Sequence, residues 1–260
     1  MDAVATSISS ARVSTTKRRW LSAKPIPVNE RLIVALDTPD VDQAKALVEL
    51  LGEHVHFYKL GFELLISGKL PDLLCWLAEK DKKTLVDIKF FDIPRTVSAA
   101  VRQLKGMGAS FVTVHGNDRI LRAACEAGKG YVKILAVTVL TSLDKADLKD
   151  LGFPNVPVKD LVLSRAKRAL KIGCSGVISS GQEARELRNS LGENFLIVCP
   201  GIRPVENRET DDQKRTVTVR QAFERGADYV VIGRPIRTAA DPVKAAVEVQ
   251  EQIQQVFEAP

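Results

Sequence analysis

The chain contains no apolar run that approaches the roughly 20 residues of a membrane-spanning helix. Its longest apolar stretches, at 31–36 and 228–233, have only the length of a strand. Cysteine is also scarce, with 4 residues spread widely among 260 and no CxxC pair, which argues against a disulfide framework and against a zinc site. We therefore expect a protein that does not enter a membrane and whose thiols are buried and reduced in the cytoplasm.

Aromatic residues are few, and positive charge is not gathered into one region. Aromatic side chains make up 5% of the chain, and the 38 basic and 32 acidic residues are scattered along it, for a net charge of +6. Nucleic-acid-binding domains usually cluster their basic residues, so the composition disfavours a nucleic-acid partner. A basic surface favours instead the approach of a small polyanion such as a phosphorylated metabolite.

The first 29 residues lack the periodicity of a strand or a helix. They are rich in Ser, Thr and Ala and contain the basic cluster Lys17, Arg18 and Arg19. A transit peptide is one interpretation of such a segment, but no apolar core of a secretory signal is present. We favour a flexible N-terminal tail over residues 1–29, followed by a single domain over residues 30–258.

From residue 31 onward, short β-branched runs alternate with amphipathic stretches, which is typical of repeated βα units. Helical spacing of apolar residues is clearest at 41–51, 98–108, 165–173 and 242–257. The strand candidates are 31–37, 56–61, 84–89, 110–116, 132–140, 176–180, 195–200 and 228–233. Eight such units, without a GxGxxG turn after the first strand, predict an α/β fold of the (β/α)₈ TIM barrel type rather than an open doubly wound sheet.

The third strand ends in an unusual concentration of charge, DIKFFDIPRT at 87–96. Side chains alternate along a strand, so Asp87 and Lys89 are expected to face the same space. In a TIM barrel the carboxyl ends of the strands form the functional face. The polar residues expected to line that mouth are Asp37, Lys59, Asp87, Lys89, His115, Thr141, Arg203 and Arg234.

Seven motifs in order resemble those of the orotidine 5′-phosphate decarboxylase family, from about residue 31 to residue 257. They are ALD at 35–37, YKLG at 58–61, DIKFFDIP at 87–94, VTVLTS at 137–142, PGIRP at 200–204, DDQKR at 211–215 and VIGRPI at 231–236. The resemblance implies a homodimeric enzyme that converts orotidine 5′-phosphate to uridine 5′-phosphate, the last step of de novo pyrimidine biosynthesis. It also implies that no metal ion or organic cofactor takes part.

The same resemblance implies the catalytic residues. Lys89 would donate a proton to the ring carbon, after its ammonium has stabilised the developing carbanion. Asp87 would lie beside the departing carboxylate, and Lys59 together with Asp92 of the partner subunit would complete an alternating Lys-Asp-Lys-Asp array. A buried salt-bridge network without catalysis is the alternative, but burying four charges contributes little to stability.

Substrate contacts are likewise implied by the family motifs. The phosphate group would be bound by Arg203, Gln213, Gly233 and Arg234, where arginine offers a planar fork to its oxygens. The segment 203–215 would form a lid, with a mobile surface loop as the alternative. The remaining contacts implied are the ribose hydroxyls for Asp37 and Lys59, the pyrimidine edge for Thr141, and the ribose across the dimer interface for Thr96.

Two alternatives remain for the function. A magnesium-dependent phosphosugar decarboxylase or aldolase shares the DxKxxD pattern, but it has glutamate where this chain has Lys59. A catalytically silent barrel that only binds ligands would be expected to lack part of the charged array, which is intact here.

The histidines give little evidence of function. His115 fits a hydrogen-bonded structural residue, and the pair His54 and His56 is weak evidence for a metal site.

Overall fold

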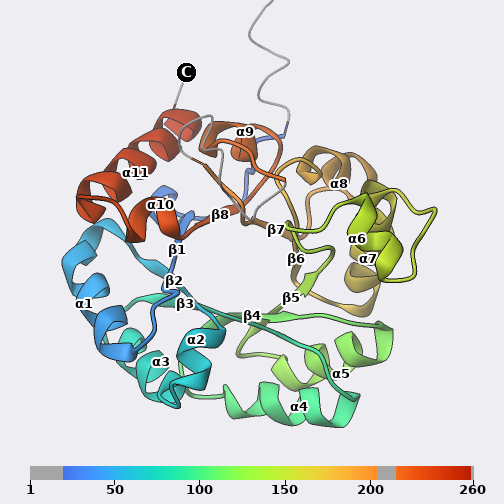
Figure 1. The fold of residues 1–260 in the computed structure, drawn as a ribbon, viewed down its shortest axis with the longest axis horizontal. Helices are drawn as coiled ribbons and strands as arrows, with labels where there is room; N and C mark the ends of the chain where they lie inside the picture. Colours follow the sequence, from blue (N-terminus) through green and yellow to red (C-terminus); the bar gives the residue numbers. More distant parts are fainter. Residues whose placement is uncertain (1–19, 204–214, 259–260) are drawn as a thin grey trace, which may run out of the picture.

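The computed structural model describes residues 20–203 and 215–258, and its eight parallel strands close into a barrel in sequence order (Figure 1). This confirms the predicted (β/α)₈ TIM barrel, and each predicted strand is present with ends that differ by at most three residues. The strands are β1 Leu32–Ala35, β2 Phe57–Leu60, β3 Lys83–Phe90, β4 Ala109–Val114, β5 Lys133–Val137, β6 Gly176–Ile178, β7 Leu196–Cys199 and β8 Tyr229–Ile232.

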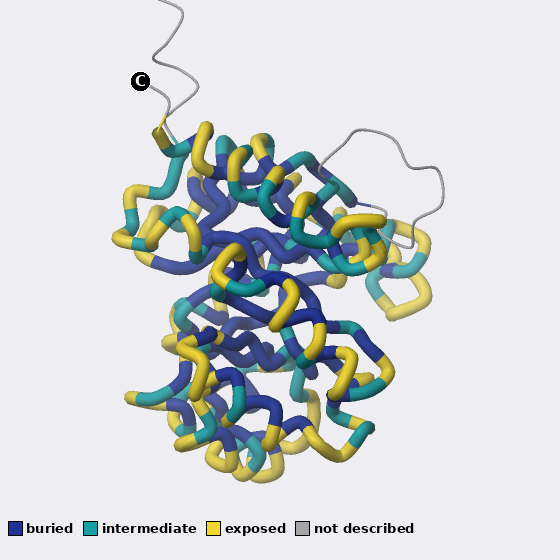
Figure 2. Tube along the Cα trace, turned by 90° about the vertical axis from the view of Figure 1, so that its left-hand side faces the viewer, coloured by how far each residue is buried: buried dark blue, intermediate teal, exposed yellow. Residues whose placement is uncertain are grey.

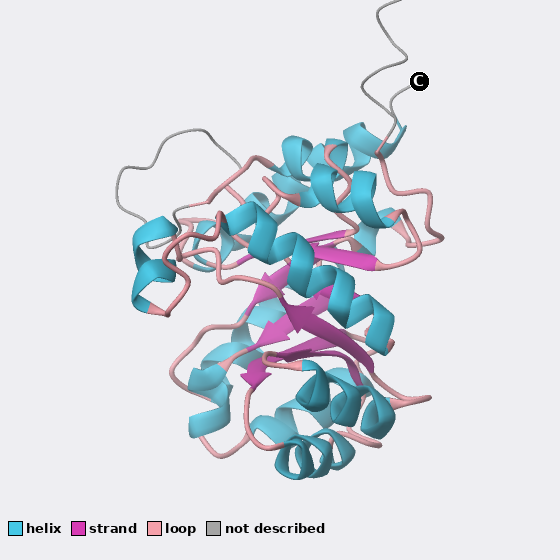
Figure 3. Ribbon diagram, turned by 90° about the vertical axis from the view of Figure 1, so that its right-hand side faces the viewer, coloured by secondary structure: helices cyan, strands magenta, loops and turns pink. Residues whose placement is uncertain are grey.

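Helices surround the strands on the outside of the barrel (Figure 3). They are α1 Val41–Leu51, α2 Phe62–Ile66, α3 Leu70–Glu79, α4 Pro94–Gln103, α5 Asp118–Gly128, α6 Lys145–Asp150, α7 Val158–Ile172, α8 Ala184–Leu191, α9 Val219–Glu224, α10 Arg234–Arg237 and α11 Pro242–Glu258, with 3₁₀ turns at Val28–Glu30 and Gly52–His54. None of these helices is long and apolar enough to cross a membrane.

One predicted helix is shorter than its sequence pattern. The pattern at 98–108 predicted helix to its end, whereas α4 stops at Gln103. Gly106 and Gly108 both adopt positive φ, 84° and 81°, which only glycine does readily. A Cβ on Gly108 would also come within 2.4 Å of the Cβ of Ala78. The chain therefore turns here, because glycine permits both the backbone conformation and the close approach to α3.

The barrel has two apolar layers, one between strands and helices and one inside the ring of strands. In Figure 2 the buried residues, in dark blue, gather at the centre of the molecule, while exposed residues lie toward its outside. Phe57, Phe111 and Tyr229 fill the interior near the strands' amino ends, with ring centroids 5.1–5.6 Å apart. Aromatic packing therefore closes this end of the barrel.

The cysteines are free thiols, but the expectation that all of them are buried is wrong for Cys75, which is exposed on α3. Cys174 and Cys199 are buried, and Cys125 is partly buried. The Sγ atoms of Cys125 and Cys174 lie 3.4 Å apart. Composition could not distinguish Cys75 from the others, because the apolar face of α3 is formed by its leucines.

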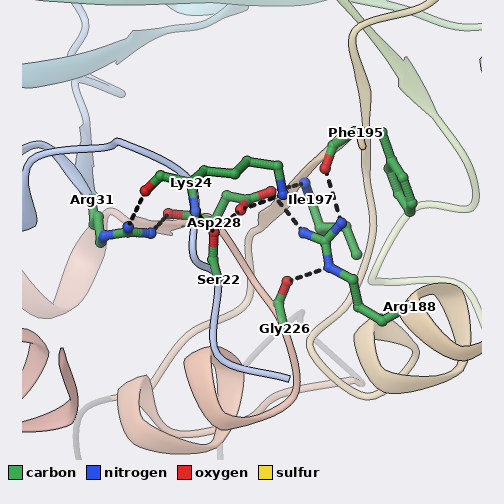
Figure 4. A network of polar contacts seen from close by, with 8 residues as sticks. All are labelled: Ser22, Lys24, Arg31, Arg188, Phe195, Ile197, Gly226 and Asp228. Carbon is green, nitrogen blue, oxygen red and sulfur yellow. Dashed lines mark hydrogen bonds and ion pairs between the residues drawn. The ribbon is translucent and has the colours of Figure 1, made fainter. Parts of the chain in front are cut away.

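A network of polar contacts ties residues 22–31 to the barrel (Figure 4). At its centre Asp228, fully buried just before β8, accepts hydrogen bonds from the backbone N–H of Ile197 at 2.8 Å and from Arg188 Nη2 at 2.7 Å. Lys24 Nζ lies 3.1 Å from the same carboxylate, and Ser22 Oγ also donates to it. These contacts involve part of the predicted tail, whose residues 1–19 lie outside the described residues.

The network connects elements that are distant in sequence. The guanidinium of Arg188 on α8 also donates to the carbonyl oxygens of Gly226 and Phe195. Arg31 donates to the carbonyl oxygen of Asp228. Buried charges are tolerated only when paired and hydrogen-bonded, and here the pairing of Asp228 with Arg188 joins β7, β8 and α8 at the amino end of the barrel.

We predict that Asp228→Asn lowers the free energy of unfolding by about 3–5 kcal/mol, because it leaves the charge of Arg188 buried without a counter-ion. Lys24→Met is the control: burial lowers the pKa of Lys24 despite its contact with Asp228, and Asp228 keeps its pairing with Arg188 without it, so its removal should cost less than about 1 kcal/mol. Urea unfolding followed by circular dichroism measures both. Equal losses for the two variants would contradict a central role for the Asp228–Arg188 pair.

Candidate active site

The strand β3 departs from regular geometry at the residues that carry its charge. Val86 is aligned with Val112 of β4 and Phe90 with Val114, so β3 uses four residues where β4 uses two. Lys89 has φ 45°, in the left-handed region that a residue with a side chain rarely adopts. The prediction of a regular strand is therefore wrong at this point, because β3 contains a bulge.

The bulge nevertheless brings the expected charges together. Lys89 Nζ lies 3.0 Å from Asp87 Oδ1, and Lys59 Nζ lies 3.6 Å from Asp87 Oδ2. Lys59 Nζ is also 2.7 Å from Asp37 Oδ1. The carboxyl ends of β1, β2 and β3 thus present four alternating charges, Asp37, Lys59, Asp87 and Lys89, which we call the charged array.

Asp92 is not a member of the charged array within this chain. It is exposed, and its Oδ1 accepts a hydrogen bond from the backbone N–H of Ile93. Thr96, on α4, is exposed as well. Both residues lie outside the lining of the cavity described below. Within the described part of this chain, the acidic group at the end of the array is Asp37 instead.

The ionisation of Asp87 is set by competing effects. Burial alone raises the pKa of this carboxyl, but Lys59 and Lys89 favour the anion. Hydrogen bonds from Lys89 and from the Thr113 hydroxyl favour it further, and together these contacts lower the pKa of Asp87 below its ordinary value. Asp87 is therefore an anion at neutral pH and loses that charge only in acid, as pH falls through the lowered pKa.

The charged array borders a cavity of about 550 Å³ at the carboxyl ends of the strands. Its walls include most of the residues predicted from the sequence, namely Asp37, Lys59, Asp87, Lys89, Thr141, Arg203, Gly233 and Arg234. Gln213 lies outside the described residues. The cavity therefore has anions and cations along one wall and arginines from the segments after β7 and β8 along another.

His115 was expected at this mouth, but it does not line the cavity. It is partly buried and lies edge-on to Phe91, with centroids 5.4 Å apart. Burial, together with the nearby Arg165, lowers the pKa of His115. Its imidazole is therefore neutral near pH 7 and packs as a structural group. No three His, Cys, Asp or Glu side chains among residues 20–203 and 215–258 come together as a possible metal site.

Sequence reasoning missed Arg237 and Gly61, which also line the cavity. Arg237 lies three residues after Arg234, a spacing that places both on one side of a helical turn, and its Nε is buried without a hydrogen-bond partner. A Cβ on Gly61 would lie 3.0 Å from Asp37 Oδ1 and 3.3 Å from Lys59 Nζ. The i, i+3 spacing could have identified Arg237, whereas nothing in the sequence reveals the crowding at Gly61.

Comparison with family models and with known proteins points to one family. A family model described as "Orotidine 5′-phosphate decarboxylase / HUMPS family" matches residues 30–249. An orotidine 5′-phosphate decarboxylase of Methylococcus capsulatus is 60% identical over 240 residues, covering 92% of this chain and 98% of that protein. One of Xanthomonas euvesicatoria is 50% identical over 236 residues, covering 90% and 96%.

Solved structures resemble this chain in fold as well as in sequence. The crystal structure of orotidine 5′-phosphate decarboxylase from Lactobacillus acidophilus superposes with a TM-score of 0.75 at 34% identity, and covers 86% of this chain and 99% of its own. The corresponding enzyme from Pyrococcus horikoshii gives a TM-score of 0.67 at 25% identity, with coverage of 86% and 99%.

The left-handed backbone of Lys89 leads to a prediction about stability. We expect Lys89→Gly to unfold with a free energy about 1 kcal/mol higher than Lys89→Ala, because glycine alone adopts this conformation without steric cost. Lys83, an exposed lysine at the regular start of β3, is the matched control, where alanine should be the more stable by about 0.5–1 kcal/mol. Urea unfolding measures all four variants, and the same order at both positions would exclude strain at Lys89.

Proposed function

Because the chain belongs to the orotidine 5′-phosphate decarboxylase family and converts orotidine 5′-phosphate to uridine 5′-phosphate in pyrimidine biosynthesis, we propose that the charged array carries out this reaction. The observation that supports the proposal is the contact of Lys89 with Asp87 at the wall of the cavity, 3.0 Å between Nζ and Oδ1. An ammonium held by an anion at the cavity wall would be available to a bound nucleotide.

The chemistry requires a cation at this position. The bond between the ring carbon and the carboxylate breaks, carbon dioxide leaves, and the electron pair stays on the ring carbon. The ammonium of Lys89 stabilises that developing charge and then transfers one proton to the carbon, so the new C–H bond forms at the expense of an N–H bond. Since Asp87 holds the ammonium before the substrate binds, little reorganisation accompanies the reaction.

Asp87 has a second part in the proposal. Its lowered pKa keeps it anionic at neutral pH, so a substrate carboxylate placed beside it is repelled. That repulsion disappears as neutral carbon dioxide departs, whereas the attraction between Asp87 and Lys89 persists. Lys59 holds the other oxygen of Asp87 at 3.6 Å, which fixes the orientation of the carboxylate.

The far end of the nucleotide is proposed to bind the arginines that follow β7 and β8. TIM-barrel enzymes often bind phosphate in the segments after strands 7 and 8. Arg203 follows β7, while Gly233 and Arg234 follow β8. We assign the phosphate to these residues together with Gln213, the ribose hydroxyls to Asp37 and Lys59, and the pyrimidine edge to Thr141. Binding energy from the phosphate would then hold the ring against Lys89.

We propose that the enzyme is a homodimer in which Asp92 and Thr96 enter the site of the partner subunit. The flanking side chains support this, because Phe91 is 67% exposed and Ile93 is 64% exposed. Large apolar side chains grouped on a surface are typical of interfaces. Asp92 of the partner subunit would give Lys89 a second carboxylate, completing the Lys-Asp-Lys-Asp alternation. Residues 30–258 would form the catalytic domain, acting in the cytoplasm without a metal or organic cofactor.

Lys89→Ala should lower kcat by about 10⁴-fold or more, since it removes both the charge stabilisation and the proton donor. Binding of uridine 5′-phosphate should stay measurable by calorimetry. Lys83→Ala, at the opposite end of β3, is the control and should keep normal turnover. The assay follows the absorbance change of orotidine 5′-phosphate in the presence of a chelator. Near-normal turnover of Lys89→Ala, or loss of wild-type activity that magnesium restores, would contradict the mechanism.

Arg234→Ala should raise KM about 10- to 100-fold, the cost of losing a charge-assisted contact with phosphate. Steady-state kinetics measure the effect. Arg225→Ala is the control, because Arg225 follows α9 and does not line the cavity. If KM for Arg234→Ala stays at the wild-type value, the phosphate binds elsewhere.

A further inference from the structure

One hydroxyl group makes hydrogen bonds with both charged residues of the bulge in β3. Thr113, on β4, is fully buried. Its Oγ1 accepts a hydrogen bond from the backbone N–H of Lys89 at 2.9 Å and donates to Asp87 Oδ1 at 2.9 Å. The same side chain therefore contacts the backbone of one charged residue and the carboxylate of the other.

The bulge explains why a hydroxyl is needed here. A regular parallel ladder would pair the amide of each strand residue with a carbonyl of the neighbouring strand, but the alignment of β3 with β4 shifts between Val86 and Phe90. A buried amide must still find an acceptor. The Thr113 oxygen provides it for Lys89, and this contact stabilises the left-handed backbone that directs the lysine toward Asp87.

The direction of the two hydrogen bonds is fixed by chemistry. An amide can only donate and a carboxylate can only accept, so the hydroxyl must accept from Lys89 and donate to Asp87. Thr113 points to the barrel interior two residues after Phe111, which belongs to the inner apolar layer. A hydroxyl in such surroundings is costly unless both of its hydrogen bonds are made.

We propose that Thr113 is a positioning residue of the decarboxylation site, whose hydroxyl sets the geometry of Asp87 relative to Lys89. The inference rests on the function proposed for these two residues. Thr113 does not line the cavity, so it acts through them and not on the substrate. Small displacements of reacting groups are costly, since about 1 Å can reduce a rate about 100-fold.

The test compares substitutions that separate the hydroxyl from the shape of the side chain. Thr113→Val keeps the shape and loses both hydrogen bonds, whereas Thr113→Ser keeps the hydroxyl and loses a methyl group. We expect kcat to fall about 100-fold in the valine variant and to stay near wild type in the serine variant. KM should change little in either, because the residues proposed to bind the phosphate follow β7 and β8, away from β4. A side chain that only fills space would give the opposite order.

Thr84→Val is the matched control. Thr84 is also fully buried on β3, and its hydroxyl donates to the carbonyl oxygen of Gly108 at 3.3 Å, away from the cavity. Its kcat should match the wild-type value. If Thr113→Val does not fold, Thr113→Ala and Thr113→Ser form a second pair that differs only in the hydroxyl, and the alanine variant should have the lower kcat.

The pH profile gives a readout that packing would not change. The charged groups that face Asp87 are Lys59 from β2 and Lys89 from β3, and the Thr113 hydroxyl from β4 also favours the anion. Loss of the hydroxyl raises the pKa of Asp87, so activity disappears at a higher pH on the acid side. We expect the acid side of the kcat/KM profile to move to higher pH in Thr113→Val and to stay at the wild-type pH in Thr113→Ser.

Equal kcat values for the serine and valine variants, or wild-type kcat and pH profile in Thr113→Val, would overturn the proposal. Lys89→Ala distinguishes this failure from failure of the proposed function. If Lys89→Ala is inactive while Thr113→Val is normal, only the positioning role is wrong. If Lys89→Ala is active, the role of Lys89 itself is wrong.

Discussion

The site depends on keeping four charges of alternating sign close together in a partly enclosed barrel mouth. Desolvation makes each of them costly alone, and their mutual attraction offsets this only when the geometry is well defined. Closure of the barrel supplies that geometry, because β1, β2 and β3 are neighbours and end at one face. Asp87 illustrates the balance, since burial raises its pKa while the two lysines and the Thr113 hydroxyl together lower it below the ordinary value.

The two ends of the barrel have different tasks. At the amino ends of the strands, three aromatic rings fill the interior and Asp228 joins β7, β8 and α8. At the carboxyl ends, the interior widens into the cavity with its charged wall. TIM-barrel enzymes separate stability from chemistry in this way. Dense packing at the amino ends of the strands allows the carboxyl ends to hold polar groups and a strained backbone.

Much of the fold could be predicted from the sequence, because the strand and helix periodicities of apolar residues are clear in eight βα units. The charged residues also lie at the strand ends where the sequence predicted them. The bulge was not accessible, since alternation assumes a regular strand and Lys89 departs from it. Thr113 has the composition of an ordinary strand residue, and its role depends on a register shift that no local pattern encodes. The same applies to Asp228, whose partners Lys24 and Arg188 are far apart in the sequence.

The polar network around Asp228 also determines where the chain enters the barrel. The carbonyl oxygen of Trp20 lies 3.3 Å from the position that a Cβ on Gly226 would occupy, just before β8 and at the amino ends of the strands. A polypeptide joined at residue 20 would therefore start on the face turned away from the cavity at the carboxyl ends of the strands. Immobilisation or fusion through this side should leave the cavity unobstructed.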